Sequence, residues 1–333
     1  MSTKVIVATA TVATSVAAGI GLYYLYRQHS AREKMMEERL DRIMSIFDTD
    51  VSCKCQDSAI LRGKIRAILN GGKERFQILT DFDKTLSSYF VDGGLKGHSS
   101  FQVIEESSQM GASVQDSLKA LHAKYYPLEM SPTLSSEEKT PLMIEWYKSS
   151  FNIGLNAGIQ KALLPSMVKE TRVALRSGMD EFFRKVKMFD IPTLVASAGL
   201  GDVIDEVFIQ QADLPSQVSV LANFYEFNEE GIAVGLQNKE MLHTFNKDKI
   251  SLLHKPYFDA QSNRTNALVM GDTLGDPTMS NNIDYLKCIL KVGFLNSNVE
   301  NSLTQYLSVY DLVLTRDASM AVVNVLLQEL FGE

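Results

Sequence analysis

Apolar residues along the chain recur in short runs that are separated by longer segments with helical spacing. Short apolar runs bounded by turn residues are typical of strands buried on both faces of a parallel sheet, and the periodic segments between them of the helices that cover it. Such runs lie at 76–80, 191–196, 218–222, 267–270, 289–294 and 310–314. A β-hairpin is expected over 224–236, where turn residues interrupt an apolar stretch. The pattern predicts an α/β fold with a Rossmann-like parallel sheet.

A long helical segment separates the first two predicted strands. Helical patterns lie at 113–125, 136–149 and 166–187. This is too much chain for a simple crossover between neighbouring strands. We therefore predict a helical cap domain over 91–187, inserted into a catalytic core built from 58–90 and 188–333.

The N-terminus differs from the rest of the chain. Residues 5–26 carry no charge, and several arginines follow them, whereas only Lys4 precedes them. The length and the charge bias predict a transmembrane helix, with an anchor over 1–30, a linker over 31–57 and the catalytic domain in the cytoplasm, at the endoplasmic reticulum or the mitochondrial outer membrane. A mitochondrial targeting segment is an alternative, and a cleaved secretory signal is disfavoured.

Composition restricts the partners. The 333 residues carry a formal net charge of −7, which argues against a nucleic-acid polymer as a partner. Three cysteines form no disulfide framework and indicate a reducing compartment. Cys53-x-Cys55 has no second ligand pair at metal-binding spacing, so we do not interpret it as a metal site.

Polar residues follow the predicted strands at their carboxyl ends, where ligands bind in such sheets. Asp81-x-Asp83 follows the first strand, Ser197-Ala198-Gly199 the second, and Gly271-Asp272 a later one, with Asp276 four residues on. Lys247 stands alone in a polar segment. Paired carboxylates, a phosphate-binding turn, a cation and a metal carboxylate are the groups that metal-assisted phosphoryl transfer needs.

Their order resembles the four-motif pattern of the haloacid dehalogenase superfamily of phosphotransferases. A closer resemblance, over about 58–331, is to the cytosolic 5′-nucleotidase III family, which includes the pyrimidine 5′-nucleotidases and their 7-methylguanosine-phosphate-preferring relatives. It is carried by these segments: Asp81-Phe82-Asp83-x-Thr85-Leu86-Ser87, Lys124-Tyr125-Tyr126, Glu145-Trp146-Tyr147, Ser197-Ala198-Gly199-x-Gly201-Asp202, Phe245-Asn246-Lys247 and Tyr310-Asp311-Leu312-Val313-Leu314.

The resemblance implies a role for each motif. Asp81 would be the nucleophile and Asp83 the acid and base. Mg²⁺ would be held by Asp81, the Asp83 backbone carbonyl and Asp272, with Asp276 in the outer shell. Ser197, the Ala198 backbone and Lys247 would hold the phosphate.

In the cap, the resemblance implies that Glu129 reaches the nucleobase and that Ser150 assists it. The expected function is therefore Mg²⁺-dependent hydrolysis of nucleoside 5′-monophosphates by a monomer. The resemblance also implies phosphotransferase activity when a second nucleoside takes the place of water. Pyrimidine and 7-methylguanosine substrates both stay open, and the loop over 91–108 departs from the family pattern. A phosphatase of another small metabolite, such as phosphoserine, is the alternative enzyme. An inactive, membrane-tethered nucleotide-binding protein is the alternative from another class.

Overall fold

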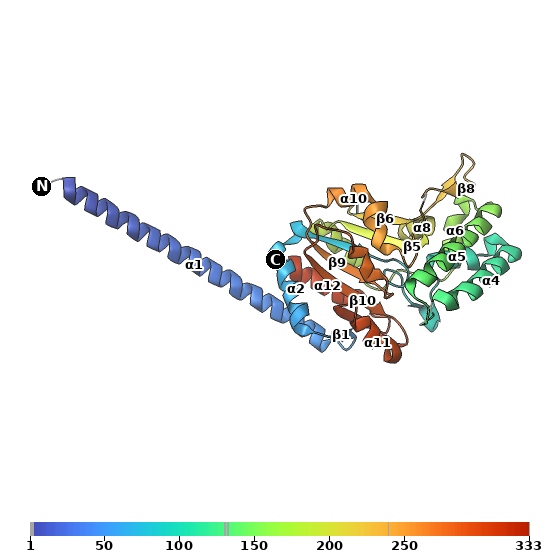
Figure 1. The fold of residues 1–333 in the computed structure, drawn as a ribbon, viewed down its shortest axis with the longest axis horizontal. Helices are drawn as coiled ribbons and strands as arrows, with labels where there is room; N and C mark the ends of the chain where they lie inside the picture. Colours follow the sequence, from blue (N-terminus) through green and yellow to red (C-terminus); the bar gives the residue numbers. More distant parts are fainter. Residues whose placement is uncertain (1–2, 130, 132, 239, 333) are drawn as a thin grey trace.

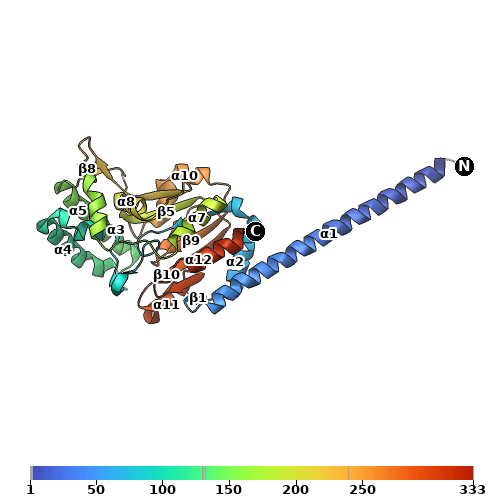
Figure 2. The same ribbon diagram turned by 180° about the vertical axis from the view of Figure 1, so that it is seen from behind.

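The computed structural model describes residues 3–129, 131, 133–238 and 240–332, with only the backbone described for 3–22 and 24. A body containing the main sheet lies at the centre of the molecule (Figure 1). A helical lobe adjoins one side of the body, and a long N-terminal helix leaves the body on the other side, as the reverse view also shows (Figure 2).

Within the described residues, the main sheet has seven strands in the order β1-β11-β10-β9-β2-β5-β6. All neighbours are parallel except β1 and β11, which pair antiparallel at one edge. Taken across the sheet, the strands are β1 (Cys53–Lys54), β11 (Leu312–Thr315), β10 (Cys288–Leu295), β9 (Asn266–Gly271), β2 (Phe76–Thr80), β5 (Thr193–Leu200) and β6 (Val218–Asn223).

The central strands β2, β5 and β9 are buried along their whole length because helices cover both faces of the sheet. On β2, Ile78 belongs to the main core cluster, whereas Leu79 belongs to a second cluster on the opposite face. The main cluster includes residues of α2 (Ser58–Gly71), α7 (Met179–Phe189), α8 (Gly201–Gln211) and α12 (Ala321–Phe331). The second includes residues of α9 (Ile250–Leu253) and α10 (Lys255–Ala260), and α11 (Val299–Leu307) packs on β10 and β11.

The helical lobe is built from the chain between β2 and β5. It contains α4 (Ala112–Glu129), α5 (Ser136–Asn156) and α6 (Leu164–Glu170), and α5 contacts the hairpin of β7 (Tyr225–Phe227) and β8 (Ala233–Leu236). A short hairpin of β3 (Phe90–Val91) and β4 (Leu95–Lys96) leads to α3 (Ser100–Glu106), which packs on α4 and also on β5 and α8. The helical pattern expected over 166–187 is interrupted between α6 and α7, where the chain returns to the body and Gly178 adopts a φ of +88°.

The N-terminal prediction requires a correction. The backbone of α1 (Thr3–Thr49) is one continuous helix, but no helix in the described part of the chain is both long and apolar enough to cross a membrane. The transmembrane helix predicted over 5–26 is therefore wrong, and the membrane partner and the membrane anchoring lose their support. Alanine, threonine, serine and glycine occupy much of this segment, and they offer less apolar surface for transfer into hydrocarbon than leucine or isoleucine.

The second half of α1 belongs to the body. Leu40, Ile43 and Phe47 are buried in the main core cluster, and the helix packs on α2 and α12. Strand β1 follows this helix and adds the antiparallel edge to β11. The segment 31–57 thus carries an apolar face at helical spacing, and that face is covered.

Candidate active site

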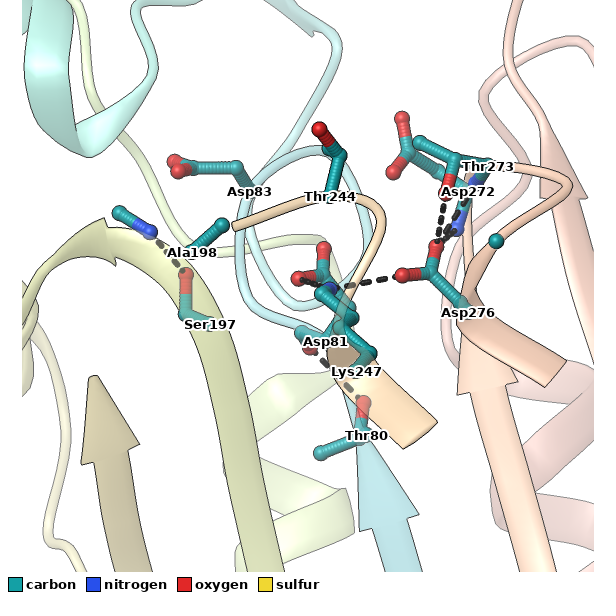
Figure 3. Close-up of polar contacts among 12 residues, drawn as sticks. Thr80, Asp81, Asp83, Ser197, Ala198, Thr244, Lys247, Asp272, Thr273 and Asp276 are labelled. Carbon is teal, nitrogen blue, oxygen red and sulfur yellow. Dashed lines mark hydrogen bonds and ion pairs between the residues drawn. The ribbon is translucent and has the colours of Figure 1, made fainter. Parts of the chain in front are cut away.

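The polar residues that follow β2 and β9 and those in the last part of β5 lie together at the carboxyl edge of the sheet (Figure 3). Strands β2 and β9 are parallel neighbours, with Thr80 opposite Met270. The ladder continues one step beyond β2, because the Asp81 amide donates to the Met270 carbonyl at 3.0 Å. Asp81 and Asp272 therefore leave adjacent strands at nearly the same level.

Lys247 joins two carboxylates in the interior of this site. Its Nζ lies 2.5 Å from Asp81 Oδ1 and 2.7 Å from Asp276 Oδ1, and all three residues are buried. Burial raises the pKa of Asp81 to about 7, against the opposing effect of Lys247. Burial alone would lower the pKa of Lys247, but Asp276 and Asp81 outweigh it and raise that pKa, so the lysine stays protonated.

Asp81, Asp272 and Asp276 form a carboxylate cluster that fits a divalent cation. One oxygen from each lies within 4.8 Å of the others. Among the described residues, none donates a hydrogen bond to the Asp272 carboxylate, and its pKa is raised well above the usual range by burial and by the neighbouring Asp81 and Asp276. A half-buried carboxylate repelled by two buried ones gains most from a cation with oxygen ligands, which is the preference of Mg²⁺.

Asp276 is fixed on both of its oxygens. Oδ1 accepts from Lys247, while Oδ2 accepts from the amides of Asp272 and Thr273 at 3.0 and 2.8 Å. A Cβ at Gly271 would lie 2.1 Å from the Cβ of Asp276, so only glycine permits this approach. With both oxygens engaged, Asp276 orients the loop and the lysine.

The last part of β5, where the register to β6 shifts between Ala196 and Leu200, faces the carboxylates from the other side (Figure 3). Ser197 is buried, and its hydroxyl accepts from the Gly199 amide at 3.0 Å. Asn223 at the end of β6 donates from Nδ2 to the Ala198 carbonyl at 2.8 Å and to the Leu242 carbonyl at 2.8 Å. The Asn223 side chain thereby joins the last part of β5 to the segment that leads to Lys247.

Asp83 points away from the cluster of three carboxylates (Figure 3). Its two oxygens accept from the amide and the hydroxyl of Ser100, each at 2.7 Å. Burial raises the pKa of Asp83, and Lys84 and the Ser100 hydrogen bonds oppose the change. The raised pKa favours the protonated form, which suits a group that delivers a proton.

A buried arginine holds the chain directly after Asp83 by hydrogen bonds to its backbone. Arg176 donates to the carbonyls of Lys84 and Thr85 and pairs with Asp317 at 2.9 Å. Lys84 has a φ of +63°, a left-handed conformation that is unfavourable for a residue with a Cβ. The arginine contacts stabilise this turn, which sets the direction of Asp83.

Glu129, at the end of α4, reaches across to the body. Its Oε1 accepts from the hydroxyl of Thr244 at 2.8 Å, three residues before Lys247 in the same segment. Burial raises the pKa of Glu129. Burial also raises the pKa of Tyr147, and the nearby charge of Glu129 adds to the effect. The helical lobe and the segment that carries Lys247 therefore meet at Thr244.

Two other cap residues lie within the lobe. Ser150 is buried on α5, three residues after Tyr147 and on the same side of the helix, and no hydrogen bond joins its side chain to the described site residues. Trp146 stacks on Tyr125 with 5.9 Å between ring centroids and on His122 with 5.8 Å. These rings pack with one another inside the lobe.

The structure thus brings Asp81, Ser197, Lys247 and Asp272 to one edge, with Asp83 beside them. It adds three residues to which the sequence assigned no role: Ser100, Arg176 and Asn223. A signal for Ser100 existed, since Ser99-x-x-Gln102 has the spacing of a capping box and starts α3 in the structure. Arg176 and Asn223 act on backbone carbonyls and leave no motif in the sequence.

A family model described as pyrimidine 5′-nucleotidase (UMPH-1) matches residues 84–331. Among curated proteins, 7-methylguanosine phosphate-specific 5′-nucleotidase A of Xenopus laevis is 39% identical over 275 residues, which cover 83% of this chain and 94% of the relative. The Homo sapiens 7-methylguanosine phosphate-specific 5′-nucleotidase is 34% identical over 266 residues, which cover 80% of this chain and 88% of the relative.

A solved structure agrees with these matches. The crystal structure of cytosolic 5′-nucleotidase IIIB bound to cytidine superimposes with a TM-score of 0.80 at 33% identity. The match covers 87% of this chain and 97% of that one. The body and the helical lobe are therefore shared with that protein.

Proposed function

The chain belongs to the pyrimidine 5′-nucleotidase (UMPH-1) family, and on that premise we propose that it is a Mg²⁺-dependent 5′-nucleotidase. Its substrates would be pyrimidine or 7-methylguanosine 5′-monophosphates, which are the classes that the names of its relatives describe. The observation that carries the proposal is Lys247, held between Asp81 and Asp276 at the edge where Asp272 also lies.

In this mechanism Asp81 attacks the phosphorus atom, and the bond from phosphorus to the ribose 5′-oxygen breaks as the aspartyl-phosphate forms. Asp83 gives its proton to the departing oxygen. A water molecule then attacks phosphorus and passes a proton to Asp83, and the bond to Asp81 breaks. Nucleoside and inorganic phosphate are the products.

The phosphate would be held by Ser197, the Ala198 amide and Lys247, whose positive charge offsets charge that develops on the phosphoryl oxygens. Asp81 and Asp272 would hold Mg²⁺ together with the Asp83 carbonyl. When bound, the ion neutralises phosphate charge and allows a carboxylate to approach an anionic substrate. Asp276 keeps the lysine and the loop over 272–273 in place.

The base would be chosen in the helical lobe, with Glu129 accepting from an amino group on the base edge and Ser150 beside it. A buried carboxylate left without a donor disfavours the wrong base strongly. Transfer of the phosphoryl group to a second nucleoside in place of water would give phosphotransferase activity. The names of relatives also support a cytoplasmic site of action.

The test is phosphate release with Mg²⁺ from CMP, UMP, 7-methyl-GMP and phosphoserine. We expect turnover of at least one of the three nucleotides and none of phosphoserine. Cleavage of phosphoserine alone would reject the nucleotidase assignment. Asp81→Asn serves as the inactive control, because it keeps the shape of the side chain and removes the nucleophile.

A further inference from the structure

The Asp83 carboxylate is held by a residue far from it in the chain. Ser100, the first residue of α3, donates from its amide to Oδ1 and from its hydroxyl to Oδ2, each at 2.7 Å. Ser100 is completely buried. Both oxygens of Asp83 thus have the same partner, and the carboxyl group is fixed in rotation.

A backbone amide of the body holds the Ser100 hydroxyl in turn. It accepts from the Leu200 amide at 3.2 Å, and so its own proton is directed to Asp83. A Cβ at Gly199 would lie 1.9 Å from Ser100 Oγ and 2.8 Å from Asp83 Oδ2. Glycine at 199 leaves the space that the hydroxyl occupies, and any larger residue would displace it.

Ser100 also lies where the body meets the lobe. Helix α3 packs on β5 and α8 of the body and on α4, which ends at Glu129. The position of the carboxyl group at Asp83 therefore depends on the segment that leads into the lobe.

Resting on the proposed function, we infer that Ser100 is a positioning residue for proton transfer. It holds Asp83 in the orientation that delivers a proton to the ribose 5′-oxygen as the bond from that oxygen to phosphorus breaks. Ser100 touches neither the phosphate nor the nucleophile in this proposal, and it acts only through Asp83.

The experiment compares two substrates that share one nucleoside. One is the natural 5′-monophosphate, and the other carries sulfur in place of the bridging 5′-oxygen. A thiolate leaves as a much weaker base than an alkoxide and does not need the proton of Asp83. Nucleoside release is followed in a single turnover with Mg²⁺, so that only the first chemical step is measured.

For Ser100→Ala we expect release from the oxygen ester to slow by about 10-fold to 100-fold, because a positioned acid contributes roughly 10²-fold to 10⁴-fold. Release from the sulfur ester should change less than about threefold, since that step does not use the acid. Asp83→Asn should show the same selectivity more strongly. Ser99→Ala is the matched control: it removes the adjacent helix cap, which accepts from the Gln102 amide, and leaves both contacts to Asp83.

Equal slowing of both esters in Ser100→Ala would assign the serine a structural role and overturn the inference, as would no slowing of either. Ser100→Gly removes the same hydroxyl and should show the same selectivity, so the inference is testable even if one variant folds poorly. Failure of the unmodified protein to release nucleoside from any oxygen ester would reject the proposed function instead.

Discussion

The two ends of the candidate site are built differently. At the phosphate end, Lys247, Asp81 and Asp276 are buried and interlocked, and each loop that carries them is fixed by further hydrogen bonds. At the base end, Glu129 makes one hydrogen bond to Thr244, and the aromatic rings pack among themselves. The phosphate end is a fixed arrangement of charges, whereas the base end consists of a few separable contacts.

This difference separates the reaction from its specificity. Charges that must meet a transition state gain from being fixed before the substrate arrives. Contacts that choose a base act mainly on binding, and one can be changed without disturbing the others. Substitutions that break the buried ion pairs of Lys247 should therefore lower kcat and stability together, and those at the base end should change KM and base preference.

The largest effect is expected for Lys247→Met. It removes the cation between two buried carboxylates, so we expect kcat to fall by about 10³-fold. The free energy of unfolding, measured in urea, should fall by about 3–5 kcal/mol, because the substitution removes one partner of a buried ion pair and leaves the other uncompensated. Lys249→Met is the matched control, since Lys249 pairs with Glu240 at the surface. Equal effects of the two substitutions would mean that the buried ion pairs of Lys247 contribute no more than the surface ion pair of Lys249.

Asp272→Asn tests the cation site with a readout other than turnover. The Asp272 carboxyl has its pKa raised by burial and by Asp81 and Asp276, so its charged form destabilises the metal-free fold at neutral pH. The variant should unfold at a higher temperature than the original without Mg²⁺, and it should lose most of the stabilisation that Mg²⁺ gives. Asp284→Asn, at an exposed position, should change neither value. If Mg²⁺ stabilised Asp272→Asn against thermal unfolding as much as the original protein, Asp272 would not be a ligand of the cation.

At the base end, Glu129→Gln should raise KM by about 10-fold to 100-fold for a base with an amino edge, with little change in kcat. Burial raises the pKa of Glu129, so the ionised form that accepts from the base is lost as pH falls through that raised value. The KM of the original protein should therefore rise on acidification, and that of the variant should not. A matching pH profile in both proteins would exclude Glu129 from base binding.

The smallest effect on turnover is expected for Asp202→Asn, at the contact between α8 and the hairpin of β7 and β8. Asp202 accepts from the Tyr225 amide, and burial raises its pKa to about 6. Its protonated form is favoured in the folded state, so its contribution to stability is present at low pH and is lost as pH rises from about 4 to about 6. We expect the free energy of unfolding to fall by about 1–3 kcal/mol over this pH range in the original protein, and the variant should not show this fall. Asp213→Asn, at an exposed position, should keep it.

The sequence predicts the phosphate end better than the rest. Asp81 and Asp272 directly follow strands, Ser197 lies in the last part of β5, and parallel strands bring residues at such positions to one edge. Arg176 and Asn223 escaped prediction because they act on backbone carbonyls across the fold, which neither spacing nor composition indicates. The capping-box spacing of Ser99 and Gln102 marks the start of α3, but the contact of Ser100 with Asp83 depends on how that helix packs on the body. For the first half of α1, the absence of charge suggested a membrane span, although alanine, threonine and glycine reduce its apolar surface.

The second half of α1 has a consequence for how the chain reaches its native state. Strand β1 pairs with β11, and Arg39 donates to the Gly332 carbonyl, so the start of the body is completed by its last residues. Arg42 and Glu329 add an ion pair at 3.1 Å between the same two segments. Contacts this distant in sequence form late, since the loop between them must close first. During synthesis, the part of the apolar face of α1 that packs on α12 therefore stays uncovered until α12 has left the ribosome, and it is accessible to chaperones until then.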